Sequence, residues 1–144
     1  MSEVSNSFVS YNYDNSWNEY LDSEEENYYI YVPKIDETGY SGIISISYGY
    51  TTYLASDYEL MKQEIIKSFE EEGEVFTTTD LNTEKGYSAI LVEIAYDDPK
   101  SFDKLYYILT DNKYALVYST DYYVSGVNVD EVALEMVNSL TFTK

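Results

Sequence analysis

Carboxylates and tyrosines are the side chains of this sequence that could do chemistry. It has 27 aspartates and glutamates and 19 tyrosines, but no histidine, cysteine or arginine. The commonest general base, the thiol nucleophile and the usual phosphate clamp are therefore absent. A carboxylate-based hydrolase needs two acids facing each other about 5–9.5 Å apart. With so many acids, some pair meets that distance by chance, so we predict that the protein is not an enzyme.

Two dense acidic clusters could hold a hard cation such as Ca²⁺. One contains Asp97, Asp98 and Asp103 in "YDDPKSFD", and the other lies in "DSEEEN", residues 22–27. Neither has the alternating acids and central glycine of an EF-hand loop. Solvated acidic turns are the favoured interpretation. We predict no cofactor, with weak calcium binding at Asp97, Asp98 and Asp103 as the alternative.

The tyrosines divide into two groups. Those of residues 103–120 alternate along a predicted hairpin whose two faces are both apolar enough to be covered, as expected for a strong β-former. Tyr50, Tyr53, Tyr122 and Tyr123 fall at strand ends or in loops. If they are exposed together, they would form an aromatic patch for a peptide or a sugar ring. The alternative is that these loops pack against a helix.

The net charge of −19 limits the partners of the protein. Nucleic-acid binding needs cations that neutralise phosphates, so we predict none. The same field repels anionic lipid headgroups, and no apolar run reaches the ~18 residues of a membrane helix, so we also predict no membrane insertion. Attraction of a basic protein or peptide partner fits this charge. The oligomeric state cannot be predicted.

Hydrophobic periodicity predicts an α+β fold. Apolar side chains at 3–4-residue spacing indicate helices at Asp57–Glu72 and Val129–Leu140. Alternating segments predict strands in the order β-β-β-α-β-β-β-β-α, and mostly hairpin-like links favour an antiparallel sheet of about six to seven strands. Residues 1–15 are expected to be a loose N-terminal arm with room for a short strand at Phe8–Tyr13. Residues 16–144 are expected to form a single domain.

Several strings in this order resemble the PsbP/Mog1/DcrB-like superfamily, which includes PsbP-related small bacterial lipoproteins. They are "WNEYLDSEEENYYIYVPK", "KGYSAILVEI", the hairpin around "TDNKYALVYS" and the final helix ending in "MVNSLTF". The resemblance covers about residues 17–143. It implies an αβα sandwich with a central antiparallel sheet. It also implies a mostly non-catalytic role, because members serve as accessory subunits, chaperones, partners of a GTPase or envelope lipoproteins.

These observations lead to two functional expectations. The first is a non-enzymatic binding or accessory module outside the cell, as the mature part of a secreted or surface-anchored lipoprotein whose export signal has been removed. The second is a cytoplasmic acidic interaction protein, such as a secretion chaperone or an immunity-like inhibitor, that binds a basic protein. The gene sequence upstream of Met1 would distinguish them, because only the first requires a lipobox.

Overall fold

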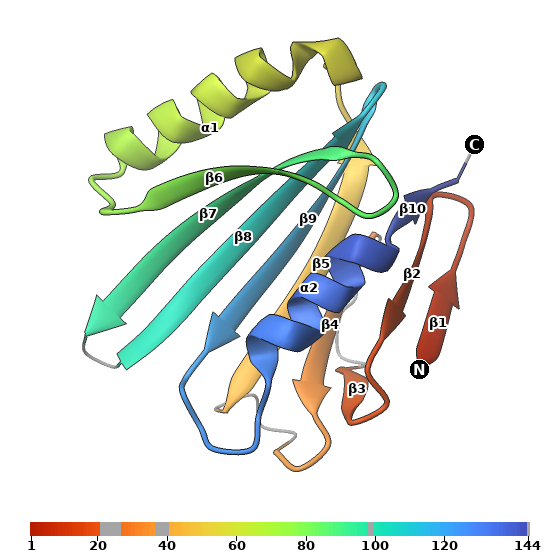
Figure 1. Cartoon of the computed structure of the whole chain (residues 1–144), viewed down its shortest axis with the longest axis vertical. Helices are drawn as coiled ribbons and strands as arrows, with labels where there is room; N and C mark the ends of the chain where they lie inside the picture. Colours follow the sequence, from red (N-terminus) through yellow and green to blue (C-terminus); the bar gives the residue numbers. More distant parts are fainter. Residues whose placement is uncertain (21–26, 37–40, 98–99, 144) are drawn as a thin grey trace.

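A large antiparallel sheet forms the centre of the molecule (Figure 1). The computed structural model describes residues 1–20, 27–36, 41–97 and 100–143. Within these residues, seven strands lie in the order β3-β4-β5-β9-β8-β7-β6, with every neighbouring pair antiparallel. Their bounds are β3 Trp17–Tyr20, β4 Tyr28–Pro33, β5 Gly42–Tyr50, β6 Thr77–Asn82, β7 Ser88–Asp97, β8 Lys100–Thr110 and β9 Lys113–Asp121.

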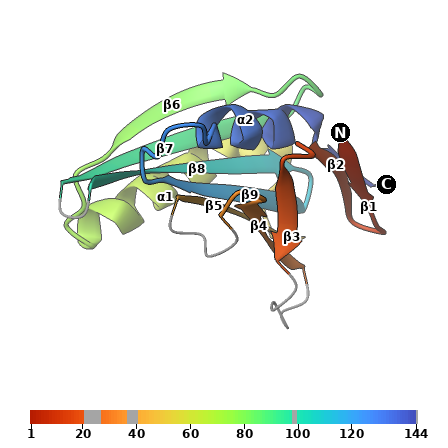
Figure 2. The same cartoon turned by 90° about the horizontal axis from the view of Figure 1, so that it is seen from below.

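Each face of this sheet is covered by one helix, as Figure 2 shows. Helix α1, Tyr58–Glu71, follows a short 3-10 turn, η1, at Ala55–Asp57, and α2 spans Val129–Ser139. Because side chains alternate along a strand, β8 sends Leu105 and Leu109 to the α1 side and Tyr106 and Ile108 to the α2 side. The predicted αβα sandwich is therefore confirmed, and so is the hairpin covered on both faces.

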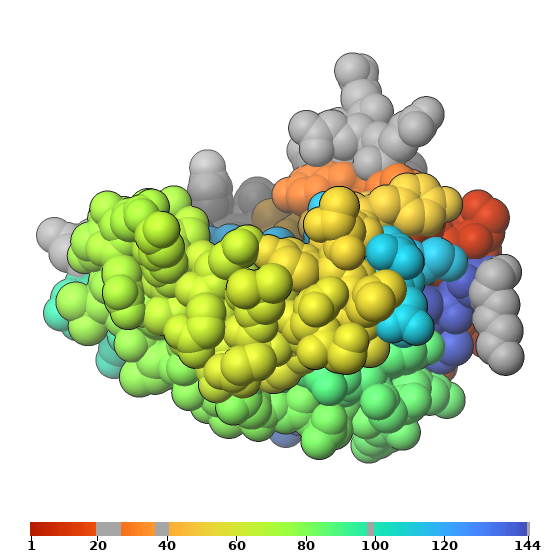
Figure 3. Space-filling model, turned by 90° about the horizontal axis from the view of Figure 1, so that it is seen from above, coloured from red at the N-terminus to blue at the C-terminus, as the bar shows by residue number. Residues whose placement is uncertain are grey.

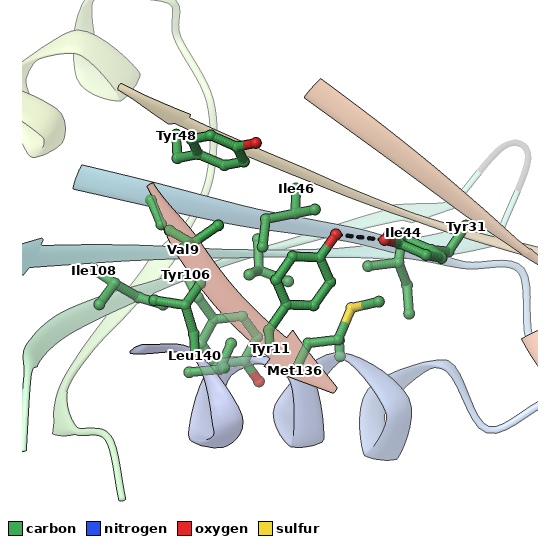
Figure 4. Close-up of a cluster of buried hydrophobic side chains, with 14 of the residues drawn as sticks. Val9, Tyr11, Tyr31, Ile44, Ile46, Tyr48, Tyr106, Ile108, Met136 and Leu140 are labelled. Carbon is green, nitrogen blue, oxygen red and sulfur yellow. Dashed lines mark hydrogen bonds between the residues drawn. The ribbon is translucent and has the colours of Figure 1, made fainter. Parts of the chain in front are cut away.

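The first fifteen residues are not the loose arm that the sequence predicted. Strands β1, Ser2–Ser5, and β2, Val9–Tyr13, form a three-stranded sheet with β10, Thr141–Phe142. Val9 and Tyr11 point inward and are 0% and 1% exposed. The Tyr11 and Tyr31 hydroxyls form a buried hydrogen bond between the small sheet and β4 (Figure 4). The expected short strand therefore exists, and its alternating apolar face makes it part of the core.

The start of α2 lies very close to β5. Asn128 is its N-cap residue. A Cβ atom added at Gly42 would lie 2.5 Å from Cγ2 of Val129 and 3.5 Å from the Trp17 ring. Only glycine therefore allows this approach. It brings the first turn of α2 next to β3, and this contact shapes the surface described below.

Candidate functional site

The four tyrosines predicted as a patch lie at opposite ends of the sheet. In the β5–β9 register, Tyr50 pairs with Lys113 and Gly42 pairs with Asp121. Tyr122 and Tyr123 follow Asp121, so about eight residues of strand, or ~27 Å, separate the two pairs. A single aromatic patch of all four is therefore not formed.

Tyr50 and Tyr53 differ in their surroundings. Tyr53 is half-buried, and its hydroxyl donates a hydrogen bond to Glu64 of α1, which raises the pKa of the phenol. The segment 51–55 is also tied to the β8–β9 turn, since the Asn112 amide N–H donates to the carbonyl of Tyr53 at 2.8 Å. Figure 3 shows this yellow segment against the cyan turn. Tyr53 therefore packs against a helix, which was the alternative to an exposed patch, whereas Tyr50 is 77% exposed.

At the other end of β9, Tyr122 is half-buried and Tyr123 is 51% exposed. Tyr123 has a φ of 60°, in the left-handed region. Its amide N–H donates to Oδ1 of Asp121 at 2.8 Å, and the Lys100 ammonium lies 5.0 Å from the centre of its ring. The Tyr123 ring therefore already has a cationic neighbour within the chain.

The predicted acidic cluster is divided by the sheet. Asp103 is 5% exposed, and its two carboxylate oxygens accept hydrogen bonds from the Tyr118 hydroxyl at 2.6 Å and the Thr120 hydroxyl at 2.8 Å. Its carboxylate is thus part of the internal hydrogen bonding between β8 and β9. Asp97 is exposed at the end of β7, and Asp98 and residues 22–26 lie outside the described residues. Among the described residues, no three acids are grouped as metal ligands.

A hollow in the described surface lies along the solvent side of α2, and we call it the α2 groove. It encloses about 470 Å³. Besides α2 and the segment before it, the turn between β2 and β3, the start of β3 and the end of β4 line the groove; Figure 1 shows where these elements lie relative to α2. The residues that line it are Asp14, Ser16, Trp17, Pro33, Ile35, Gly126, Val127, Asn128, Glu131, Val132, Leu134, Glu135 and Asn138.

One wall of the α2 groove is built by β3 and β4. Trp17 and Pro33 are paired in the β3–β4 register, and both are buried. The Trp17 amide N–H donates to the Asp14 carbonyl at 3.0 Å, and the Lys34 amide N–H donates to the Ser16 carbonyl at 2.9 Å. The second of these bonds holds the turn before β3 against the end of β4. Ile35, which follows it, is 73% exposed.

The other wall is the outer face of α2. Glu131, Leu134, Glu135 and Asn138 recur at three- and four-residue spacing, which places them on one side of a helix. Leu134 is 43% exposed. The opposite side of α2 carries Val129 and Met136 into the core, as the predicted apolar stripe required. The groove therefore has apolar side chains in both walls, two carboxylates on α2 and a third, that of Asp14, in the turn before β3.

The α2 groove is electrostatically negative. Asp14, Glu131 and Glu135 line it, and none of the residues that line it is a lysine. The Ser16 hydroxyl and amide N–H donate to Oδ1 of Asp14 at 2.6 and 2.7 Å, and these bonds hold the pKa of this carboxyl below its usual range. The salt bridges among the described residues join Lys62 to Asp80, Lys67 to Glu71 and Lys104 to Asp130. The three groove acids take part in none of them.

Sequence reasoning did not find the α2 groove. The apolar stripe of α2 could be predicted from spacing, but Leu134, Glu131 and Glu135 are ordinary choices for the solvated side of a helix. The sequence signal that could have been noticed is Ile35, an apolar residue flanked by Lys34 and Asp36 just after the "YYIYVP" strand. Its relation to α2, about a hundred residues away in sequence, depends on the tertiary structure.

Neither helix of the described chain combines the length and apolar character that a membrane crossing requires. No protein-family model and no curated protein matches the sequence. The structure is similar to a protein of Bacteroides thetaiotaomicron VPI-5482 solved at 1.50 Å resolution, with a TM-score of 0.62 and 17% sequence identity. The match covers 94% of this chain but 45% of that one, so this chain spans less than half the length of its structural neighbour. At this identity the likeness concerns the fold alone.

Proposed function

We propose that this chain is a non-enzymatic binding module that holds a protein or peptide partner in the α2 groove. The observation that carries the proposal is the combination of a 470 Å³ hollow with two exposed apolar side chains, Ile35 and Leu134, on its walls. Large apolar side chains at a concave and otherwise polar surface are typical of protein-binding sites.

The chemistry of the residues supports binding rather than catalysis. The sequence has no histidine, cysteine or arginine, so the groove could use only its carboxylates. A general acid must hold a proton near neutral pH, and that requires a raised carboxyl pKa. The pKa of Asp14 is shifted the other way by its bonds from Ser16, so it remains charged. A charged carboxylate at this position suits recognition of a cation.

The proposal is compatible with the resemblance to the PsbP/Mog1/DcrB-like superfamily, which implies an accessory role on an αβα sandwich. Membership of that superfamily and a location at the cell surface are part of the same proposal. The reading frame upstream of Met1 tests the location. A lipobox there would support an anchored lipoprotein, and a native start at Met1 would favour the cytoplasmic interaction protein instead.

The binding role is tested by removing the apolar side chains of the groove. The double variant Ile35→Gln and Leu134→Gln changes exposed residues and should leave the fold intact. Its matched control is Leu60→Gln with Val75→Gln, which removes two apolar side chains that are 55% and 88% exposed and do not line the groove. Quantitative affinity capture from the native source is the measurement.

We expect the wild type and the control to retain the same partner and the groove variant to lose it. A partner that all three proteins retain equally would show that binding does not use the α2 groove. Circular dichroism and urea unfolding of each variant verify that the fold is unchanged.

A further inference from the structure

We propose that the α2 groove takes an extended peptide segment in which two basic side chains at alternate positions flank an apolar one. This inference rests on the proposed binding function and names the chemistry of the partner. It is drawn from the two carboxylates of α2, Glu131 and Glu135, and from the apolar side chains of the facing wall, Trp17, Pro33 and Ile35.

The charge of the groove selects a basic segment. Asp14, Glu131 and Glu135 line the groove without a salt bridge among the described residues, and the net charge of −19 adds a long-range field of the same sign. That field opposes a nucleic acid, an anionic membrane and a second copy of this chain. A lysine or arginine side chain would gain a favourable contact with these acids and would approach faster.

The spacing of the two helical acids indicates how the basic residues are arranged. Glu131 and Glu135 are one turn apart on α2, about 6 Å along the helix axis. In an extended peptide, side chains that point the same way are two residues apart, about 6.8 Å. Basic side chains at positions i and i+2 of the partner can therefore reach Glu131 and Glu135 together.

The residue between them then faces the opposite wall, because side chains of an extended segment alternate in direction. That wall presents Trp17, Pro33 and Ile35, which suit an aliphatic or aromatic side chain.

A second hollow continues beyond the α2 groove and shares Glu135 and Asn138 with it, so the two hollows together follow the length of α2. Eleven helical residues span about 16 Å, which corresponds to about five extended residues. The second hollow is lined by Lys85 as well as by Glu84, so its charges partly cancel. The negative potential is therefore concentrated in the α2 groove near Glu131.

Trp17 provides a direct signal for the test. It is the only tryptophan of the chain, and it lines the groove. The probe is the capped peptide Gly-Lys-Leu-Lys-Gly, titrated against the full chain while the emission of Trp17 is recorded. Two control peptides carry glutamine in place of both lysines, or serine in place of leucine.

We expect the lysine peptide to shift the emission of Trp17 and both control peptides to bind more weakly, by about fivefold or more for the glutamine peptide. The affinity should fall as the salt concentration rises from about 0.01 M to about 1 M, because the Debye length shrinks from ~30 Å to ~3 Å. The double variant Glu131→Gln and Glu135→Gln should lose most of the preference for lysine, because only Asp14 and the long-range field of the chain remain. The control variant Glu70→Gln and Glu72→Gln makes the same change in net charge at the end of α1 and should retain the preference for lysine.

The outcomes separate this inference from the proposed function. Equal binding of the lysine and glutamine peptides to the wild type would overturn the basic character of the partner and leave the groove as a binding site. A lysine preference that both double variants lose equally would assign the effect to net charge and overturn the role of Glu131 and Glu135. If none of the three peptides binds, the inference is also overturned. The proposed function itself stands or falls with the Ile35 and Leu134 variant in affinity capture.

Discussion

Alkaline unfolding should report how the tyrosines are buried in this protein. Tyr106 is 3% exposed, and burial raises its pKa to about 12, with smaller contributions from the carboxylates of Asp130 and Glu93. In the unfolded chain a tyrosine has a pKa of about 10. A raised pKa means that the folded state holds the proton more tightly. The stabilisation is therefore complete below about pH 10 and is lost as the pH rises through the folded pKa.

The expected size of this loss follows from proton linkage. At about pH 11, most of the unfolded molecules have lost this proton and most of the folded molecules retain it, which costs on the order of 1 kcal/mol of stability. The Tyr106→Phe variant has no such proton, so between about pH 8 and about pH 11 its free energy of unfolding should decrease less than that of the wild type, by on the order of 1 kcal/mol. Urea unfolding at the two pH values, followed by circular dichroism, measures this difference.

The matched control is Tyr50→Phe, which removes a hydroxyl from a side chain that is 77% exposed. This variant should lose stability with pH as the wild type does. The absorbance of tyrosinate gives a second reading, because Tyr11 and Tyr31 also have pKa values raised by burial and should ionise only when the chain unfolds. If Tyr106→Phe and the wild type differ by the same amount at both pH values, the reasoning about Tyr106 is wrong.

Three further predictions concern the packing that positions the site. Gly42→Ala should destabilise the fold by about 1–3 kcal/mol in urea unfolding, because the new Cβ would overlap a side chain at the start of α2; an unchanged midpoint would contradict this. Tyr118→Phe should cost about 1–3 kcal/mol in the same assay, because the buried Asp103 carboxylate loses a donor; a neutral result would mean that water replaces the hydroxyl. Hydrogen bonds from the Lys62 ammonium and, to a smaller extent, the Tyr58 hydroxyl lower the pKa of Asp80. The charged Asp80 carboxylate therefore stabilises the fold above about pH 4, and this stabilisation is lost as the pH falls below that value. Lys62→Gln should reduce the acid dependence of unfolding, and an identical acid profile would refute the assignment.

Local patterns predicted most of the elements in this fold. The apolar stripes placed α1 and α2 within one residue of their observed ends, and alternation predicted the β8–β9 hairpin with its two covered faces. These signals are strong because a helix or strand that buries one face must repeat its apolar residues with its own period. The prediction of a loose N-terminal arm was wrong. A strand of five residues shows too few alternations of apolar and polar side chains to be recognised, and β2 is held in the core by its packing against α2.

The placement of possible ligand-binding side chains could not be predicted in the same way. Tyr50 and Tyr123 looked equivalent in the sequence, but the β5–β9 register carries them to opposite ends of the sheet. Asp103 looked like a surface acid beside Asp97, yet its place in β8 turns it inward toward Tyr118. Strand register and the direction of each side chain are set by pairing between distant segments, which composition and spacing do not contain.

The amino-acid sequence by itself determined the chemical character of this protein. The absence of histidine, cysteine and arginine and the net charge of −19 depend on residue types alone, and they restrict what any arrangement of the chain can bind. The tertiary structure alone decided where that character is concentrated. The α2 groove joins Trp17 and Ile35 to Glu131 and Glu135 because the close approach at Gly42 seats α2 beside β3 and β4. Such a site depends on contacts between segments far apart in the chain, which only the packed core brings together.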